Sequence, residues 1–215
     1  MSDQIPFLPY IISAFIGIGL AAATGFRVFM PMFAVSLASY LGWIPMNESF
    51  EWLAGLPTLI TTGIAMIAEI LAYYIPFIDH LLDTISVPLA TIAGSVMFAS
   101  QFADIGTFPQ WALALIAGGG TAAAISSGFA GTRAAATATT GGLGNSVVAT
   151  TEAASAGIMS FLALAAPVIA FIAAVALIIT VLVLGKKLWR KFRNFNSDQN
   201  AKVINVVAVD QKNLE

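Results

Sequence analysis

The sequence of 215 residues has no cysteine, a single histidine and few charged residues. Without cysteine there is no disulfide framework, no thiol nucleophile and no thiolate metal site. One histidine argues against a structural zinc site. Charged residues make up 9% of the chain, against about 25% in an average soluble domain. So few polar groups cannot coat a water-soluble surface, and their scarcity predicts a protein embedded in lipid.

The sequence is rich in apolar residues: hydrophobic residues make up 59% of the chain, and its mean hydropathy is +0.90. A helix needs about 20 mainly apolar residues to cross a bilayer. Segments of this kind are 7–26, 28–44, 56–75, 87–102, 111–131 and 157–184. The sequence therefore predicts an all-α, polytopic transmembrane helical bundle of about five to seven spans.

Seven of the nine Lys and Arg residues lie from Lys186 onward, directly after the last apolar segment. Such a cluster is a cytoplasmic anchor by the positive-inside rule, with Trp189 at headgroup level. It predicts a multi-pass protein of the inner (cytoplasmic) membrane with a cytoplasmic C-terminus, and its position argues against nucleic-acid binding. Residues 1–193 then form one transmembrane domain, and 194–215 a flexible cytoplasmic tail. Residues 1–6 carry no positive charge, so the first apolar segment is interpreted as a retained span rather than a signal peptide.

Two shorter segments have an amphipathic pattern. The segment 47–53 is interpreted as interfacial, with Phe50 and Trp52 as anchors. In 76–85, apolar residues recur at helical spacing, which puts Asp79, His80 and Asp83 on the opposite face. We expect that face to point to water, since the alternative, a metal site, has only one histidine available.

Glycine and proline mark the positions where helices are expected to break or bend. Only Arg27 separates the first two apolar segments, which are alternatively short or broken helices meeting near Gly25 and Pro31. The stretch 118–157 is mostly Ala, Gly, Thr and Ser, so its helices can approach closely in lipid. The candidate hinges are Gly25, Pro31, Gly119, Gly141 and Gly142.

An alanine run followed by Gly-Phe and an arginine occurs twice, at 20–27 and at 121–133. With three spans in each half, the segments 7–105 and 106–185 would be inverted repeats with broken or re-entrant helices, an arrangement common in secondary transporters. Chance similarity between two alanine-rich runs is the other interpretation, and both stay open.

Four ionisable residues stand alone in apolar or small-residue sequence: Arg27, Glu69, Arg133 and Glu152. A charge at membrane depth costs about 2.5–3.5 kcal/mol on insertion scales, so each is a functional candidate. One interpretation is that they form ion pairs that hold the bundle together. In the other they line a polar pathway, where the arginines attract an anion and the glutamates carry protons. Asn145, beside a glycine-rich turn, joins the pathway candidates.

Several of these residues together resemble one known family. The resemblance is carried, in order, by the run 19–27 with Pro31, then Glu69, Pro76, Asp79, Asp83, Pro88 and Gly94, then Arg133, Gly141, Gly142, Asn145, Glu152 and Pro167. This pattern resembles the bacterial membrane-protein family called domain of unknown function 4126, over most of residues 10–175. The resemblance implies a membrane protein but no activity. Tyr73, Tyr74 and Val87 stand where the family pattern usually has charged residues, so this chain lacks several of them.

The leading hypothesis is a small channel or secondary transporter for a small solute, an anion or a proton. The alternative is a structural or lipid-interacting membrane protein, in contact with the bilayer and in a homo-oligomer. No nucleophile–base arrangement is present, so no enzyme activity and no cofactor are expected. A lipid-headgroup enzyme that uses Asp79 and Asp83 is a third, weaker hypothesis.

Overall fold

The computed structural model describes residues 7–102, 106–187 and 190, apart from the side chains of Pro76, Phe77 and His80. The predicted tail 194–215 and the Trp189 anchor lie outside these residues. The chain divides into two units, Met1–Ile178 and Ile179–Glu215. The packing below is that of the first unit.

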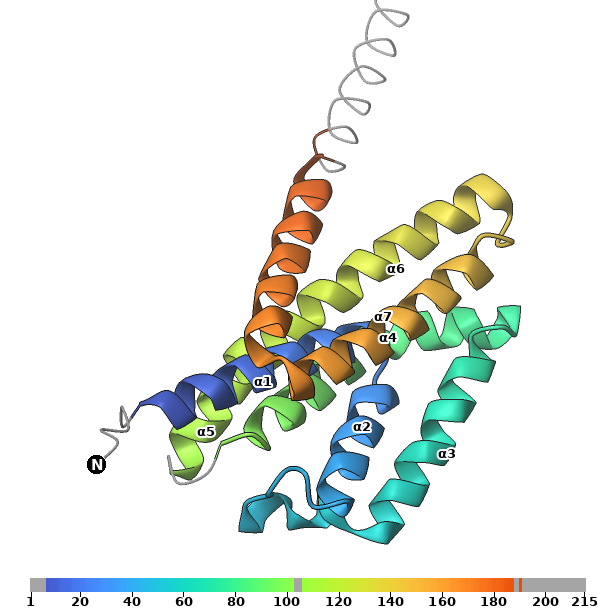
Figure 1. Cartoon of the computed structure of the whole chain (residues 1–215). Coiled ribbons are helices and arrows are strands. Elements are labelled where there is room, and N and C mark those ends of the chain that lie inside the picture. Colours follow the sequence, from blue (N-terminus) through green and yellow to red (C-terminus); the bar gives the residue numbers. More distant parts are fainter. Residues whose placement is uncertain (1–6, 103–105, 188–189, 191–215) are drawn as a thin grey trace, which may run out of the picture. The chain divides into compact units, whose positions relative to one another are not determined.

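The described residues form helices and no strand (Figure 1). In chain order the elements are α1 (Leu8–Phe26), α2 (Phe29–Tyr40), the 3₁₀ helix η1 (Glu48–Ala54), α3 (Leu56–Ala72), α4 (Pro76–Ala99), α5 (Thr107–Leu113), the π-helical segment η2 (Ala114–Gly119), α6 (Gly120–Thr140), α7 (Asn145–Ala165) and a last helix, Pro167–Lys187.

Five helical segments in the described chain are long and apolar enough to cross a membrane: Leu8–Phe26, Leu81–Ala99, Thr107–Thr140, Asn145–Ala165 and Pro167–Lys187. The pair η1 and α3, bent by 62°, is a sixth if it counts as one span. The prediction of an all-α, polytopic bundle with about five to seven spans is therefore confirmed.

Helix α1 lies at the centre of the first unit and packs against α4, α6 and α7. Its second half is lined with small residues and fully buried, with Leu20 and the three following alanines at 0% exposure. A side chain on Gly19 would bring a Cβ within 2.9 Å of the Cβ atoms of Ala163 and Ala170. Small residues are required here because close backbone approach replaces the hydrophobic drive between helices in lipid.

The prediction of a span over 28–44 is wrong. The helix there, α2, has 12 residues and is about 18 Å long, well short of the roughly 30 Å of a hydrocarbon core. Arg27 adopts an extended conformation (φ −147°, ψ 130°), which ends α1. The alternative prediction of two helices that meet near Gly25 and Pro31 agrees with the structure, but the break itself lies at Arg27 and Val28. Helical backbone runs through Gly25 and Pro31, so neither of these hinge candidates is the break point.

The single span predicted over 157–184 is also wrong, since two helices meet at Ala166. Pro167 has no backbone N–H and its ring disfavours a preceding helical turn, so it is well suited to the first position of a new helix, where it stands. Two further boundaries differ without changing the number of spans. The helix predicted over 87–102 begins at Pro76, and the one predicted over 111–131 runs from Thr107 to Thr140.

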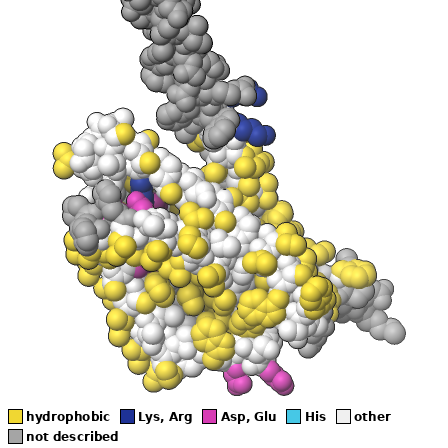
Figure 2. Space-filling model, turned by 180° about the vertical axis from the view of Figure 1, so that it is seen from behind, with side chains coloured by type: hydrophobic (Ala, Val, Ile, Leu, Met, Phe, Trp, Pro, Cys, Tyr) yellow, Lys and Arg dark blue, Asp and Glu magenta, His cyan; other side chains and the backbone are white. Residues whose placement is uncertain are grey.

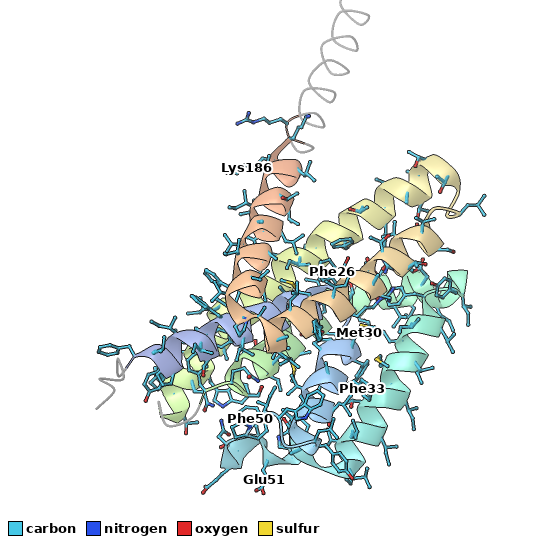
Figure 3. The ribbon with its side chains drawn as sticks, in the orientation of Figure 1. Phe26, Met30, Phe33, Phe50, Glu51 and Lys186 are labelled. Carbon is cyan, nitrogen blue, oxygen red and sulfur yellow. The ribbon has the colours of Figure 1, made fainter. Side chains whose placement is uncertain are left out.

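Both amphipathic segments pack differently from the prediction. Phe50 is 4% exposed and points into the bundle, while Glu51 points away from it (Figure 3). Phe50 is therefore not an interfacial anchor, whereas Trp52 remains half exposed. The segment 76–85 is not a separate interfacial helix but the first turns of α4. Its Asp79 is 2% exposed, so the prediction that this residue faces water is wrong.

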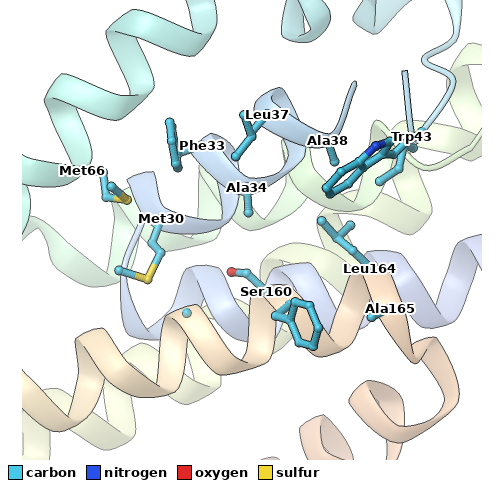
Figure 4. A pocket seen from close by; sticks show the side chains of 13 residues that line it. Met30, Phe33, Ala34, Leu37, Ala38, Trp43, Met66, Ser160, Leu164 and Ala165 are labelled. Carbon is cyan, nitrogen blue, oxygen red and sulfur yellow. The ribbon is translucent and has the colours of Figure 1, made fainter. Parts of the chain in front are cut away.

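An apolar groove with a volume of about 470 Å³ lies between α2 and α7 (Figure 4). Met30, Phe33 and Leu37 line one side, and Phe161 and Leu164 the other. Its walls carry no charged side chain, so the groove offers no group that could hold a charged solute.

Candidate functional site

Arg133, on α6, is the centre of a buried ionic cluster. Its Nε donates to Glu152 Oε1 at 2.9 Å, and its Nη2 donates to the other oxygen of the same carboxylate. Its Nη1 donates to Asp79 Oδ1 at 2.6 Å and lies 3.1 Å from Asp83 Oδ1. Paired hydrogen bonds from one guanidinium to a carboxylate are among the strongest polar contacts in proteins.

The turn between α6 and α7 explains why Arg133 meets Glu152. Gly141 and Gly142 have φ of +63° and +93°, which glycine adopts without steric cost, and the chain reverses there. Arg133 lies eight residues before Gly141, and Glu152 lies eight residues after Gly144. The two side chains therefore stand at the same level of an antiparallel helix pair.

Asn145, the first residue of α7, fixes the carboxylate of Asp79. Its Nδ2 donates to Asp79 Oδ2 at 3.0 Å, while Arg133 occupies Oδ1. The Asn145 amide also exchanges hydrogen bonds with the Thr137 hydroxyl one turn before the reversal. Both oxygens of Asp79 thus have a donor, which allows a carboxylate to remain buried.

Arg27 reaches the same cluster from the end of α1. Its Nη2 donates to the backbone oxygen of Ala149 at 2.9 Å and lies 3.3 Å from Glu152 Oε2. The side chain is 1% exposed, yet its Nε and Nη1 have no hydrogen-bond acceptor among the described residues. Burying N–H groups that have no acceptor costs free energy of folding. The Nε and Nη1 groups of Arg27 are therefore a place where a water molecule or a ligand oxygen can bind.

Tyr73 contacts both arginines with its ring. The guanidinium carbons of Arg27 and Arg133 lie 3.7 and 4.0 Å from the ring centroid. The negative face of an aromatic ring attracts cations, and the effect is larger where water is excluded. Tyr73 is itself 8% exposed and caps α3, so it closes the cluster on that side.

Glu69 has a different role at the break between α1 and α2. Its two carboxylate oxygens accept the backbone N–H groups of Val28 and Phe29 at 2.9 and 3.0 Å. The first N–H groups of a helix have no partner within it, and a carboxylate there is also favoured by the helix dipole. Glu69 therefore caps α2 from another helix, 41 residues along the chain from Val28.

The group formed by Arg27, Asp79, Asp83, Arg133 and Glu152 is called the Arg–carboxylate cluster below. Its members are almost fully buried except Asp83, whose side chain is 28% exposed. In the space-filling view, basic and acidic atoms are visible together at the bottom of a hollow in a mostly uncharged surface (Figure 2). Among the cluster members, Asp83 is the one that reaches the surface.

The structure brings most of the predicted site residues together: Arg27, Asp79, Asp83, Arg133, Asn145 and Glu152 form one connected set, with Glu69 beside it at the helix break. Among the hinge candidates, Gly141 and Gly142 form the reversal, whereas helical backbone runs through Gly119. Tyr73 was missed by sequence reasoning. Its only sequence signal is that it follows an apolar segment at a position where the family pattern has a charge.

Within the described residues, no group of three or more Asp, Glu or His side chains is arranged to hold a metal ion. The carboxylates of the Arg–carboxylate cluster turn toward the guanidinium groups instead.

A polytopic helical bundle with this internal ionic cluster defines a membrane-embedded protein rather than a water-soluble one. Residues 14–187 match the family described as Domain of unknown function (DUF4126), and the chain belongs to that family. No curated protein and no solved structure matches the chain.

Proposed function

We propose that this protein is a small secondary transporter or channel whose pathway passes the Arg–carboxylate cluster, and that the cluster exchanges protons. One observation carries the proposal. Within the described residues, the Arg–carboxylate cluster holds two arginines and three carboxylates, so full ionisation gives it a net negative charge. Burying such a charge is costly, and a proton shared among the carboxylates removes it.

The accessible end of the cluster supports the same function. Asp83 is the member in contact with the surface, and it lies 3.1 Å from the guanidinium that also binds Asp79 and Glu152. Arginine stays protonated in proteins, so the carboxylates are the groups whose charge can change. A proton that binds Asp83 can pass to the Asp79 carboxylate, directly or through a water molecule, because Arg133 Nη1 lies 2.6 Å from Asp79 Oδ1 and 3.1 Å from Asp83 Oδ1. The guanidinium itself stays protonated throughout.

A proton fits this site better than an anion. Carboxylates already occupy Arg133 on three of its nitrogens, which leaves an anion little positive charge to bind. Arg27 keeps its Nε and Nη1 groups, and a water molecule or a neutral solute oxygen can accept from them.

Orientation is part of the proposal. The basic end of helix Pro167–Lys187, with Lys186 and Lys187, is expected on the cytoplasmic side. α7 is the membrane crossing that precedes this helix, so the start of α7 is expected on the same side as Lys187. The α6–α7 turn is then cytoplasmic. A single cysteine at Leu143, which is 85% exposed in that turn, tests this in a chain without other cysteines. An impermeant maleimide should label it in inside-out vesicles and not in right-side-out vesicles; the reverse pattern contradicts the orientation.

Proton flux is measured in liposomes that contain a pH-sensitive dye, with a potassium diffusion potential set by valinomycin. We expect the wild type to acidify the lumen faster than empty liposomes, and Glu152→Gln and Asp83→Asn to lose most of that flux. Glu51→Gln, an exposed acidic residue on η1, is the matched control and should keep it. Equal rates for wild type and empty liposomes, or full flux in a folded Glu152→Gln variant, would refute the proposal.

The alternative, a structural protein whose charges only join helices, is favoured by the complete hydrogen bonding of Arg133. It predicts a loss of stability in the same variants and no flux above background in the wild type.

A further inference from the structure

The break between α1 and α2 leaves backbone oxygens without donors. In a continuous helix the carbonyl groups of Thr24 and Gly25 would accept from Val28 and Phe29, but both of those N–H groups bind Glu69 instead. Within the described residues, no hydrogen bond reaches the carbonyl oxygens of Thr24, Gly25 or Phe26. Three consecutive carbonyls at a buried helix end therefore need another partner.

A small cavity lies at this break. It has a volume of about 50 Å³ and is lined by Thr24, Gly25, Phe26, Glu69 and Ser126, among others. One water molecule needs roughly 10–15 Å³ of such space, so the cavity has room for an ion and a water or two. Most of the lining side chains are apolar, but among them are hydroxyls and the Glu69 carboxylate, and Thr24, Gly25 and Phe26 are the residues with the unpaired carbonyls.

The charge balance around the cavity is negative. A helix end carries roughly half an elementary charge, positive at the start of α2 and negative at the end of α1, so the two ends cancel at the break. What remains is the full charge of the Glu69 carboxylate. Arg27 offsets this charge only in part, because its guanidinium already lies 3.3 Å from the carboxylate of Glu152.

We infer that this cavity is a binding site for a small monovalent cation of the Na⁺ class. Hard cations of this kind prefer oxygen ligands, and broken membrane helices coordinate them through the carbonyls of an unwound end. A single carboxylate matches a single positive charge, whereas divalent sites gather several carboxylates. Among the lining hydroxyls, Ser126 is buried and makes no hydrogen bond within the described residues, so its oxygen is free to serve as a ligand.

Cation binding at the break goes beyond the proposed function and does not depend on it. Only a role for the ion in driving transport rests on the proposed function. The test therefore measures binding by stability and treats flux as a separate readout.

Thermal unfolding of the detergent-solubilised full chain is followed while NaCl replaces N-methyl-glucamine chloride at constant ionic strength and pH. A ligand that binds only the folded state raises the Tm with its concentration. We expect the wild-type Tm to rise and saturate with Na⁺. Glu69→Gln should abolish the rise, although this variant also weakens the cap of α2.

Ser126→Ala separates binding from folding, since the Ser126 hydroxyl makes no hydrogen bond within the described residues. Its Tm without Na⁺ should equal that of the wild type, while a several-fold higher Na⁺ concentration is needed for half of the shift. Ser160→Ala, another buried serine on a helix away from the cavity, is the control and should respond as the wild type does.

A wild-type Tm that is independent of Na⁺ would overturn the inference and leave water as the occupant of the cavity. An unchanged Na⁺ response in Ser126→Ala together with Glu69→Gln would overturn it as well. A Na⁺ response without proton flux contradicts the proposed function alone, and proton flux without a Na⁺ response contradicts the cation site alone.

Discussion

The contact between Arg133 and Glu152 can be tested by a double-mutant cycle. Arg133→Gln removes the guanidinium from two carboxylates that are 3% exposed, Asp79 and Glu152. Glu152→Gln removes the one carboxylate within 4.0 Å of Arg27 in the described structure and leaves Arg133 with the two aspartates. Breaking a buried pair from one side costs about 3–5 kcal/mol, because the remaining charge is buried without compensation.

The double variant is expected to cost less than the sum of its parts, since it leaves fewer uncompensated charges. The difference should be about 1–3 kcal/mol, as for contacting residues in one network. Unfolding by SDS in mixed micelles, followed by tryptophan fluorescence, measures all three variants. Glu51→Gln, exposed on η1, is the control and should change the free energy of unfolding by less than about 0.5 kcal/mol. Strict additivity, or a cost below about 1 kcal/mol for Arg133→Gln, would refute the description of a tightly coupled pair.

Three further predictions use the same unfolding assay. Gly94→Ala places a Cβ 2.5 Å from the Cβ of Ala122, so we expect a clear loss of stability. In the control Gly131→Ala the new Cβ meets nothing within 4 Å, so stability should stay the same or rise by up to about 1 kcal/mol. Equal effects of the two substitutions would contradict the close approach of α4 and α6. Tyr73→Leu removes the ring from both guanidinium groups and should lower the free energy of unfolding by about 1–2 kcal/mol. Tyr73→Phe keeps the ring and should lower it less. The opposite order would rule out the ring contact. Gly141→Ala forces a side chain onto a φ of +63° and should cost about 1 kcal/mol, and no cost would mean that the turn differs from the one described.

Much of the site was predictable because charge is rare in this sequence. Arg27, Glu69, Arg133 and Glu152 stand out from apolar surroundings, and a buried charge needs a partner. Which residues would pair was not predictable, since the partners come from different helices. The Arg133–Glu152 contact follows from the length of the turn between α6 and α7, but the contact to Asp79 depends on how α4 packs against α6.

Asp79 shows the main limit of sequence patterns here. Its place on the polar face of an amphipathic segment was predicted, and that face exists. Periodicity tells which residues share a face but not whether water or another polar face lies opposite. The length of α2 was misjudged for a related reason. The apolar run continues past Tyr40, yet the helix ends there, and Gly42 follows with a φ of +75°.

That distant cap has a consequence for how the protein is made. When α2 emerges from the ribosome, the residue that satisfies its first two N–H groups lies further back in the nascent chain and has not yet emerged. A short helix with bare N–H groups is poorly accepted by the hydrocarbon phase, so α2 gains its place only when α3 arrives. We therefore expect α2 and α3 to enter the bilayer together. Nascent chains arrested before Glu69 emerges should leave α2 outside the lipid, and those arrested after it should not.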